Sequence, residues 1–334
     1  MDKLNVLDLF CGAGGMSFGF KKAGFNIVLG VESNKNAINT FKINHKNSEI
    51  LCKDIREVSS LEIKKIMGHS KIDVIVGGPP CQGFSMAGKR IPSDPRNSLF
   101  KEYLRLVKEL KPKIFVMENV RGLLSMKDSK GIKVIEIILK EFRKIGFKTN
   151  YYKVNAADYG VPQKRHRIFI IGTQKEYNFN FPRNTHTENE GLYNKIKLKK
   201  WVGIKNILIN RKELNQKYFY SQKLIKGFKR RQYLNKLKNI GFGWQFLNPN
   251  KPSYTISARY WKDGAEALIK YKNNKIRMLT PQECALIQTF PKNYKFFGSE
   301  REIYTQIGNA VPPLLSSIIA KKIKEILIIQ NGKN

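Results

Sequence analysis

The residues best suited to chemistry in this chain are a cysteine and a glutamate that each follow a predicted buried strand. The loop Gly77-Gly78-Pro79-Pro80-Cys81 comes directly after the apolar run 72–76, and Glu118 follows the apolar run 114–117. Two glycines allow a sharp turn and two prolines stiffen it, at the edge where a parallel sheet presents ligands. The position of Cys81 on such a loop favours a nucleophilic role over a packing role for its thiol. Glu118 is expected on the same edge, where it can act as an acid.

A glycine-rich turn near the N-terminus indicates a nucleotide-binding unit. The apolar run 4–10 leads into Cys11-Gly12-Ala13-Gly14-Gly15, and a helical pattern follows to about Gly24. In such strand–turn–helix units the glycines let a ligand approach the backbone, and the helix start offers free N–H groups. Close packing alone can also require these glycines. The case for nucleotide binding therefore depends on the acidic residues that follow in the sequence.

Two acidic residues stand at the ends of the next two predicted strands. Glu32 ends the run 27–31, and Asp54 lies just past a short strand at 49–52. A carboxylate at the tip of the second strand is suited to ribose hydroxyls. The carboxylate of Asp54 is suited to an exocyclic amine such as that of adenine. A solvated helix-capping acid is the alternative for each.

Two basic segments complete the predicted site. Segment 85–97 contains Gly88, Pro92, Pro95 and the pair Lys89-Arg90, and we expect an exposed lid there. In Gln163-Lys164-Arg165-His166-Arg167, strand alternation predicts that Arg165 and Arg167 share one face. His166 is predicted to be a structural or surface histidine.

The charge of the chain predicts a polyanionic partner, nucleic acid before membrane. The formal net charge is +36, and residues 174–276 carry 23 Lys and Arg against 6 Asp and Glu, with 17 of the 37 aromatic residues. Basic residues interleaved with aromatics suit phosphate contacts and base stacking. A coding bias toward lysine is the alternative, but it does not explain why the charge density is about double in this segment.

Composition also excludes several classes of protein. No apolar run is long enough to span a membrane, and the chain enters a strand without a signal-peptide pattern. The four cysteines form no C-x-x-C pair, so we expect neither a disulfide framework nor a metal site. These features fit a cytoplasmic protein.

The order of the predicted elements indicates an α/β fold with two domains. The regular alternation of strands and helices stops at about Thr173 and resumes at Arg277. We therefore predict one domain from residues 1–173 and 277–334, and a smaller irregular domain from residues 174–276. Thr280-Pro281-Gln282-Glu283 predicts a capped helix start, and a final helix at 314–328 is expected to return to the first domain.

Six segments together resemble the DNA (cytosine-5)-methyltransferases of bacterial restriction–modification systems, in the order typical of that family. The segments are Asp8-Leu9-Phe10-Cys11-Gly12-Ala13-Gly14-Gly15, Gly78-Pro79-Pro80-Cys81-Gln82, Glu118-Asn119-Val120, Gln163-Lys164-Arg165-His166-Arg167, Leu279-Thr280-Pro281-Gln282-Glu283-Cys284-Ala285 and Gln306-Ile307-Gly308-Asn309-Ala310-Val311-Pro312-Pro313. Two positions depart from the pattern, because Leu286 stands where Arg is usual and Thr289 where Gly is usual.

The resemblance implies a Rossmann-like mixed sheet of the class I methyltransferase type with helices on both faces, and a target-recognition domain at 174–276. It implies transfer of a methyl group from S-adenosylmethionine to carbon 5 of a flipped-out cytosine in duplex DNA. Cys81 would attack carbon 6, Glu118 would donate to N3, and Arg165 would hold the O2 edge or orient Glu118. Cofactor contacts would fall on Phe10, Gly12, Ala13, Gly14, Gly15, Glu32, Asp54, Pro79 and Asn309. DNA contacts would fall on Ser85, Lys89, Arg90, Arg167 and Thr255.

The same resemblance implies that a restriction endonuclease can act on the same DNA sequence without contacting this chain. We expect the chain to be a monomer. Three other readings remain. A tRNA cytosine-5 methyltransferase would use the same catalytic residues with a less developed recognition segment. A nicotinamide-dependent oxidoreductase would explain the glycine turn but not the Pro-Pro-Cys loop. A non-catalytic DNA-binding protein would need neither Cys81 nor Glu118.

Overall fold

The computed structural model describes residues 3–68, 70–80, 97–189, 192–193, 196–237, 244–262, 264–272 and 274–331. The chain folds into two compact units. Unit 1 comprises Met1–Val154, His166–Arg183 and Pro313–Asn334, and unit 2 comprises Asn155–Arg165 and Asn184–Pro312.

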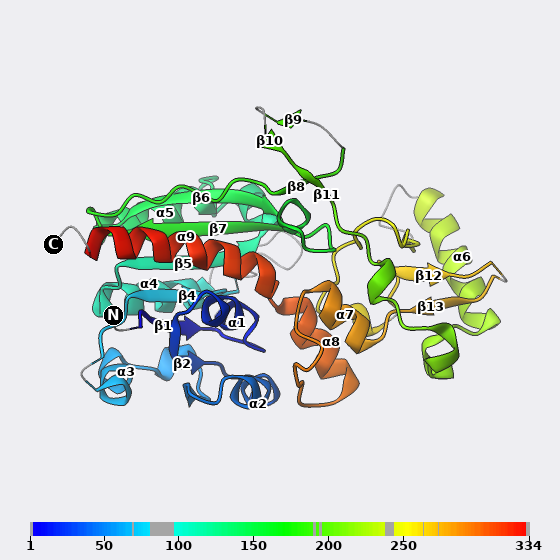
Figure 1. The fold of residues 1–334 in the computed structure, drawn as a ribbon, viewed down its shortest axis with the longest axis horizontal. Helices are drawn as coiled ribbons and strands as arrows, with labels where there is room; N and C mark the ends of the chain where they lie inside the picture. Colours follow the sequence, from blue (N-terminus) through cyan, green and yellow to red (C-terminus); the bar gives the residue numbers. More distant parts are fainter. Residues whose placement is uncertain are drawn as a thin grey trace. The chain divides into compact units, whose positions relative to one another are not determined.

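Unit 1 is built on a seven-stranded sheet with the strand order β3-β2-β1-β4-β5-β7-β6 (Figure 1). The pairs from β3 to β5 are parallel, whereas β7 runs antiparallel to β5. The predicted mixed α/β sheet is therefore confirmed. The strands are β1 (Asn5–Leu9), β2 (Asn26–Val31), β3 (Glu49–Leu51), β4 (Val74–Gly77), β5 (Ile114–Val120), β6 (Lys148–Asn155) and β7 (His166–Thr173).

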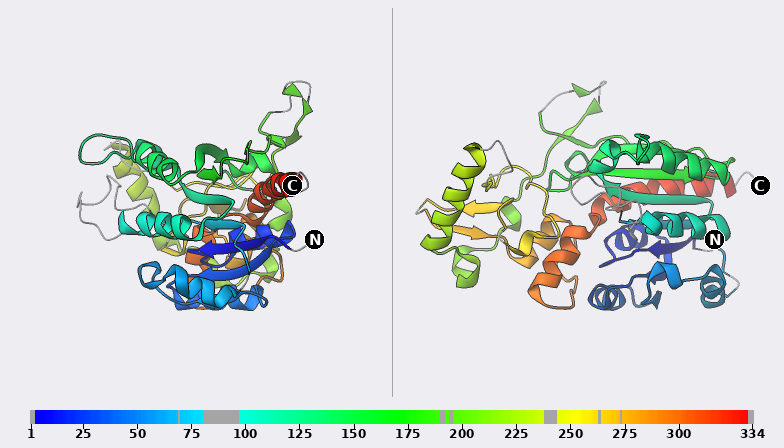
Figure 2. Two further views of the ribbon diagram at one scale, coloured as in Figure 1. Left: turned by 90° about the vertical axis from the view of Figure 1, so that its left-hand side faces the viewer. Right: turned by 180° about the vertical axis from the view of Figure 1, so that it is seen from behind.

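Helices cover both faces of this sheet (Figure 2). On one face, alternate strand residues such as Leu7 and Met117 join a buried core with α3, α4 and α5. On the other face α1 packs against α9, where the Ser316 hydroxyl donates to the carbonyl of Met16 at 2.8 Å. The predicted return of the last helix to the sheet domain is thus confirmed. The helices are α1 (Gly15–Lys22), α2 (Lys35–Asn44), α3 (Ser60–Met67), α4 (Asn97–Leu110), α5 (Val134–Lys144) and α9 (Pro313–Asn331), with 3₁₀ turns η1 (Ile55–Glu57) and η3 (Arg121–Ser125).

Unit 2 consists of short elements joined by irregular chain. Its strands are β8 (His186–Thr187), β9 (Leu192–Tyr193), β10 (Ile196–Lys197), β11 (Lys199–Lys200), β12 (Leu268–Lys270) and β13 (Ile276–Met278). Its helices are α6 (Gln222–Leu237), α7 (Pro281–Ile287) and α8 (Glu300–Asn309), and its 3₁₀ turns are η4 (Ala156–Tyr159), η5 (Lys205–Ile207), η6 (Arg211–Glu213), η7 (Gln216–Tyr218) and η8 (Tyr260–Lys262). The units differ from the predicted domain limits at several points. Unit 2 includes residues 155–165 and 277–312, and residues 174–183 belong to unit 1.

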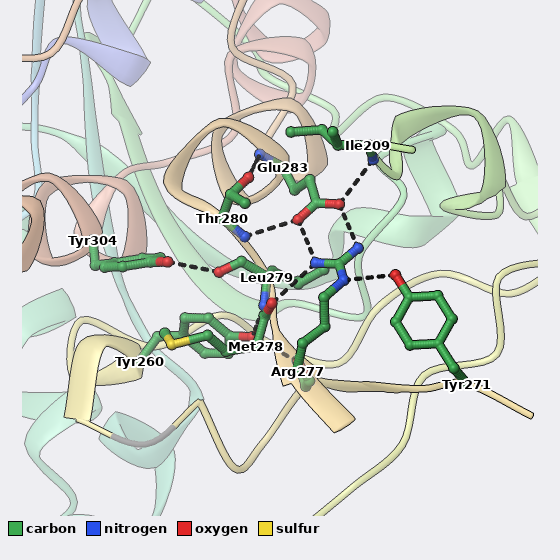
Figure 3. A network of polar contacts seen from close by, with 10 residues as sticks. Ile209, Tyr260, Tyr271, Arg277, Met278, Leu279, Thr280, Glu283 and Tyr304 are labelled. Atoms are coloured by element: carbon green, nitrogen blue, oxygen red, sulfur yellow. Dashed lines mark hydrogen bonds and ion pairs between the residues drawn. The ribbon is translucent and has the colours of Figure 1, made fainter. Parts of the chain in front are cut away.

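A buried ion pair organises the core of unit 2 (Figure 3). Arg277 and Glu283 are fully buried, and their two side chains make two contacts of 2.8 Å. Glu283 also accepts from the backbone N–H groups of Thr280 and Ile209, and the Arg277 Nε donates to the Tyr271 hydroxyl. Because both charges are fully partnered, removing either one leaves the other buried alone, which typically costs about 3–5 kcal/mol. The predicted capping box of Thr280 and Glu283 is part of this network.

Candidate functional site

The glycine turn and the carboxylate of Glu32 form one hydrogen-bonded unit at the carboxyl ends of β1 and β2. The N–H of Gly12 donates to Glu32 Oε2 at 3.0 Å, and the N–H of Asn34 donates to Oε1 at 2.9 Å. Phe10, Gly12 and Gly14 have φ values of 63°, 54° and 82°, so the chain turns through the left-handed region before α1 begins. The carboxylate is therefore held in a fixed orientation beside the turn.

The side chain of His45 packs against this glycine turn. A Cβ at Gly14 would lie 2.6 Å from Nε2 of His45, so only glycine fits there. The His45 ring stacks on Phe41 with centroids 4.3 Å apart, and it is 1% exposed. Burial and the nearby Lys21 lower the pKa of His45 to about 4, against an opposing hydrogen bond with the Gly14 backbone. His45 is therefore a neutral side chain that packs against Gly14 and restricts the turn, and no motif in the sequence predicted this role.

Asp8 lies at the centre of the same region and is 1% exposed. The Ser17 hydroxyl of α1 donates to Asp8 Oδ2 at 2.6 Å. Burial raises the pKa of Asp8 to about 7, although the Ser17 hydrogen bond acts in the other direction. The hydrogen bond between Asp8 and Ser17 therefore links β1 to α1, the two elements that the glycine turn connects.

The predicted cofactor residue Asp54 is engaged with its neighbour. Its carboxylate accepts from the Arg56 backbone N–H at 3.0 Å and pairs with the Arg56 guanidinium at 2.6 Å. These bonds to Arg56 lower the pKa of Asp54. Asp54 therefore caps η1, and its contact with a base amine stays a prediction.

The loop that leads to Cys81 begins against the end of β5. β4 pairs with β5 in parallel, with Gly77 opposite Met117. The side-chain amide of Asn119 donates to the carbonyl of Pro79 at 2.9 Å, and a Cβ at Gly78 would lie 3.2 Å from Glu118 Oε2. The two strand ends that the sequence predicted to share one edge are adjacent, and Asn119 anchors the loop two residues before Cys81.

Glu118 is 9% exposed and is ion-paired with Arg167 of β7. The Arg167 Nε lies 2.7 Å from Glu118 Oε1. This pairing follows from the antiparallel register, in which Val120 stands opposite Arg167 and Glu118 opposite Phe169. The sequence predicted that Arg167 contacts DNA and that Arg165 could orient Glu118, so the pairing of Arg167 with Glu118 was not expected.

Arg165 belongs to unit 2 and precedes the first residue of β7. Its guanidinium is fully buried, where Nη1 donates to the Ile256 carbonyl at 3.2 Å and Nη2 to the Gly308 carbonyl at 2.8 Å. Thr255 donates from its hydroxyl to the Lys164 carbonyl at 2.7 Å, and Asn309 is the exposed last residue of α8. The ligand contacts predicted for these three residues stay predictions.

Four predicted site residues, Cys81, Ser85, Lys89 and Arg90, lie outside the described residues. The free cysteines that are described are Cys11, Cys52 and Cys284. Burial raises the pKa of the Cys11 and Cys284 thiols, which opposes formation of a nucleophilic thiolate at either one.

Comparison with known proteins agrees with the geometry of the site. The family profile for C-5 cytosine-specific DNA methylase matches residues 4–325. The chain is 36% identical over 333 residues to Type II methyltransferase M1.HphI of Haemophilus parahaemolyticus, covering 96% of this chain and 86% of that protein. It is also 36% identical over 345 residues to Type II methyltransferase M.FnuDI of Fusobacterium nucleatum, covering 97% and 95%.

The fold agrees as well. A crystal structure described as a DNA modification methyltransferase encoded within a prophage of E. coli superimposes with a TM-score of 0.73 at 27% identity, covering 98% of this chain and 100% of that chain. No helix among the described residues has both the length and the apolar character required to cross a membrane. The matched residues and relatives together show that this chain belongs to the C-5 cytosine-specific DNA methylase family.

Proposed function

We propose that this chain transfers a methyl group from S-adenosylmethionine to carbon 5 of a cytosine flipped out of duplex DNA, through a covalent bond between Cys81 and carbon 6. The observation that carries the proposal is the junction of β4 and β5. There the Glu118 carboxylate lies beside Gly78, and Asn119 anchors Pro79 just before Cys81. A proton donor and the chain segment that leads to the nucleophile thus meet at one sheet edge.

The described residues of the turn fit the proposed cofactor. The Glu32 carboxylate, fixed by the N–H groups of Gly12 and Asn34, keeps lone pairs that can accept from ribose hydroxyls. α1 begins at Gly15 without a capping side chain or an acid in its first turn, so its N–H groups can meet a carboxylate. When bound, the cofactor supplies an electrophilic methyl group on a sulfonium.

Carbon 5 of cytosine is a weak nucleophile until carbon 6 is attacked. The thiolate of Cys81 adds to carbon 6, and electron density moves through the ring toward N3 and carbon 5. Glu118 donates a proton to N3 as negative charge develops there. Arg167 Nε lies 2.7 Å from Oε1 of Glu118 as an ion pair without hydrogen-bond geometry, and we assign the proton transfer to the other oxygen, Oε2.

Carbon 5 then attacks the methyl carbon, the bond from that carbon to the sulfonium breaks, and S-adenosylhomocysteine is the leaving group. The ring becomes an adduct that is saturated between C5 and C6 and still carries the C5 proton. A base removes this proton, the C5–H electron pair forms the C5–C6 double bond, and the C6–sulfur bond breaks with its electrons on Cys81. The proton on N3 returns to Glu118. The described residues do not identify the base that removes the C5 proton, and a water can serve. The target cytosine must leave the stack first, at a cost of a few kcal/mol.

Unit 2 is the proposed DNA-recognition unit because it carries basic helix α6 and an aromatic cluster. The ring centroids of Phe228 and Trp244 are 5.6 Å apart, and those of Trp244 and Phe246 are 5.1 Å apart. Lys270 lies over the Phe246 ring at 5.7 Å. Phe228 is buried and Phe246 is exposed, so the ring of Phe246 and the cation of Lys270 are the groups of this cluster that can meet a base and a phosphate.

The test is a matched pair of cysteine variants. Cys81→Ser should abolish labelled methyl transfer to genomic DNA while leaving duplex binding intact, and Cys52→Ser, which changes an exposed cysteine, should retain full activity. Substantial turnover by Cys81→Ser contradicts the covalent mechanism. DNA substituted with 5-fluorocytosine should form a denaturation-resistant adduct with the wild type alone, because fluorine cannot leave as a proton does. A parallel assay on tRNA separates the closest alternative activity.

A further inference from the structure

A lysine-rich surface lies in unit 1 at the edge of the sheet opposite Glu118. Two adjoining hollows of about 620 and 380 Å³ open there and share Lys111 and Gln174. The strand register shows that the hollows lie near the beginning of β5. Ile114, the first residue of β5, pairs with Val74 and with Thr173, whereas Glu118 lies four residues further along the strand. At about 3.3 Å per residue, roughly 13 Å of strand separates the two edges. The hollows are therefore separate from the proposed catalytic edge.

Cations outnumber acids around these hollows. The lining residues come from α3, α4, α5 and the segments that precede β4, β5 and β6. The lining cations are Lys64, Lys71, Lys108, Lys111, Lys113 and Lys144, and the lining acids are Asp73 and Glu141.

Each of the two acids forms an ion pair with one of the six lining lysines. Asp73 is 8% exposed, accepts from the backbone N–H of Asn5 at 2.8 Å and pairs with Lys113 at 2.9 Å. Glu141 pairs with Lys144 at 2.6 Å. The remaining four lysines are exposed, and within the described part of the chain none of them forms an ion pair. These four are Lys64, Lys71, Lys108 and Lys111, named here the rear lysines.

The chemistry of the hollows suits a polymer of phosphates better than a small anion. Lysine ammonium groups on long stems make point-charge contacts with phosphates and need no fixed geometry. A small-anion pocket would need oriented donors, but the side-chain amide of Gln174 donates to the Lys111 and Pro112 carbonyls. We propose that the rear lysines bind the phosphate backbone of a second duplex DNA segment.

Such a contact would act beyond the proposed methyl transfer and does not depend on it. A DNA segment bound by the rear lysines raises the local concentration of duplex near the protein. Movement of the protein from one DNA segment to the other then becomes an intramolecular step. The contact is electrostatic, and its affinity should therefore fall steeply with salt. Each phosphate contact contributes about −0.9 to the slope of log K against log salt.

The experiment compares two variants with the same change in charge. The rear variant carries Lys64→Gln, Lys71→Gln, Lys108→Gln and Lys111→Gln. The control variant carries Lys22→Gln, Lys42→Gln, Lys65→Gln and Lys140→Gln, all exposed lysines of unit 1 that do not line the hollows. Sedimentation velocity with a labelled 30-base-pair duplex of random sequence, in excess and at low salt, gives the number of duplexes bound per protein.

We expect two duplexes per wild-type protein, two per control variant and one per rear variant, with the salt slope reduced by about 0.9 for each lost contact. One duplex on the wild type and none on the rear variant overturns the proposal of a second segment, because the rear lysines would then hold the only duplex bound. Equal stoichiometry for wild type and rear variant overturns the proposal. Equal losses in both variants, or no binding by the wild type, also overturn it. Methyl transfer at saturating DNA is measured separately and should be unchanged in the rear variant.

Discussion

Arg167 and Glu118 meet across the antiparallel pair β5–β7, with Nε of Arg167 2.7 Å from Oε1 of Glu118. The other carboxylate oxygen, Oε2, lies beside Gly78 on the loop that leads to Cys81. The two oxygens thus have different neighbours, the Arg167 cation on one side and the start of the loop that leads to Cys81 on the other. Arg167 is therefore the cation beside Glu118, and we propose that it orients this carboxylate.

Replacing Arg167 should slow the chemical step more than it weakens cofactor binding. We expect Arg167→Ala to lower kcat by about 100-fold, because Glu118 loses the group that fixes its orientation toward N3. Arg167→Lys should retain part of the rate, since a cation remains. Arg143→Ala, which removes an arginine that donates to the Thr149 carbonyl, is the matched control and should leave kcat unchanged. Steady-state methyl transfer gives kcat, and titration gives the Kd of S-adenosylmethionine. A fall in affinity with kcat preserved would contradict this role.

The two arginines show where prediction from sequence stopped. Alternation predicted that Arg165 and Arg167 share a strand face, but β7 begins at His166. Arg165 is held by the carbonyls of Ile256 and Gly308, which are 91 and 143 residues away in sequence. Contacts at such separations depend on how distant segments pack, and residue spacing carries no record of them. The end of each strand, in contrast, can be predicted locally from apolar runs and glycines. The prediction that Glu118 and the segment leading to Cys81 start at one edge of the sheet is confirmed for residues 77–80.

Glu32 should contribute to cofactor affinity and little to folding. Glu32→Gln keeps the side-chain shape, but it replaces one acceptor oxygen with a donor that faces the N–H of Gly12 or Asn34. We expect the Kd of S-adenosylmethionine to rise about 10-fold, equivalent to about 1.4 kcal/mol, as measured by calorimetry. Asn34→Ala is the control, because it removes the cap of α2 and leaves the backbone N–H that Glu32 uses. That variant should lose about 1 kcal/mol of stability and keep cofactor affinity. Equal affinity for wild type and Glu32→Gln would reject the ribose role.

Thr289 departs from the family pattern at a position where the structure explains why glycine is usual. Its φ is 67°, in the left-handed region where a β-branched residue is strained, and the family usually has glycine there. Thr289→Gly should therefore raise the free energy of unfolding by about 1 kcal/mol, measured by urea denaturation. Thr289→Ala is the control and should gain less, because alanine still carries a Cβ. A destabilised glycine variant would show that contacts of the threonine outweigh the strain.

The predicted domain limits differ from the compact units for a related reason. The capping box at Thr280 and the ordered helices after it resemble the periodic first domain, so residues 277–312 were grouped with that domain. The Arg277–Glu283 pair instead ties this stretch to Tyr271 and Ile209 of unit 2. Local periodicity predicts that a helix exists, but a buried ion pair decides which core the helix joins.

Asp8 and His45 flank the glycine turn and should give stability opposite dependences on pH. The folded-state pKa of Asp8 is raised to about 7 from 3.8 by burial, so the folded protein holds a proton that the unfolded chain releases between these values. The contribution of Asp8 is therefore fully present below pH 4 and is lost as the pH rises toward 7. The pKa of His45 is lowered to about 4 from 6.5, so its contribution is present above pH 6.5 and is lost as the pH falls toward 4.

Urea denaturation between pH 5 and 6 tests both signs, because each group changes the slope of stability by up to about 1.4 kcal/mol per pH unit in this window. Asp8→Asn should make that slope more positive than in the wild type, since a group that disfavours folding at higher pH is removed. His45→Gln should make the slope more negative, since a group that disfavours folding at lower pH is removed. Parallel slopes for the wild type and both variants would mean that neither group titrates as its burial requires. The turn would then rest on packing alone.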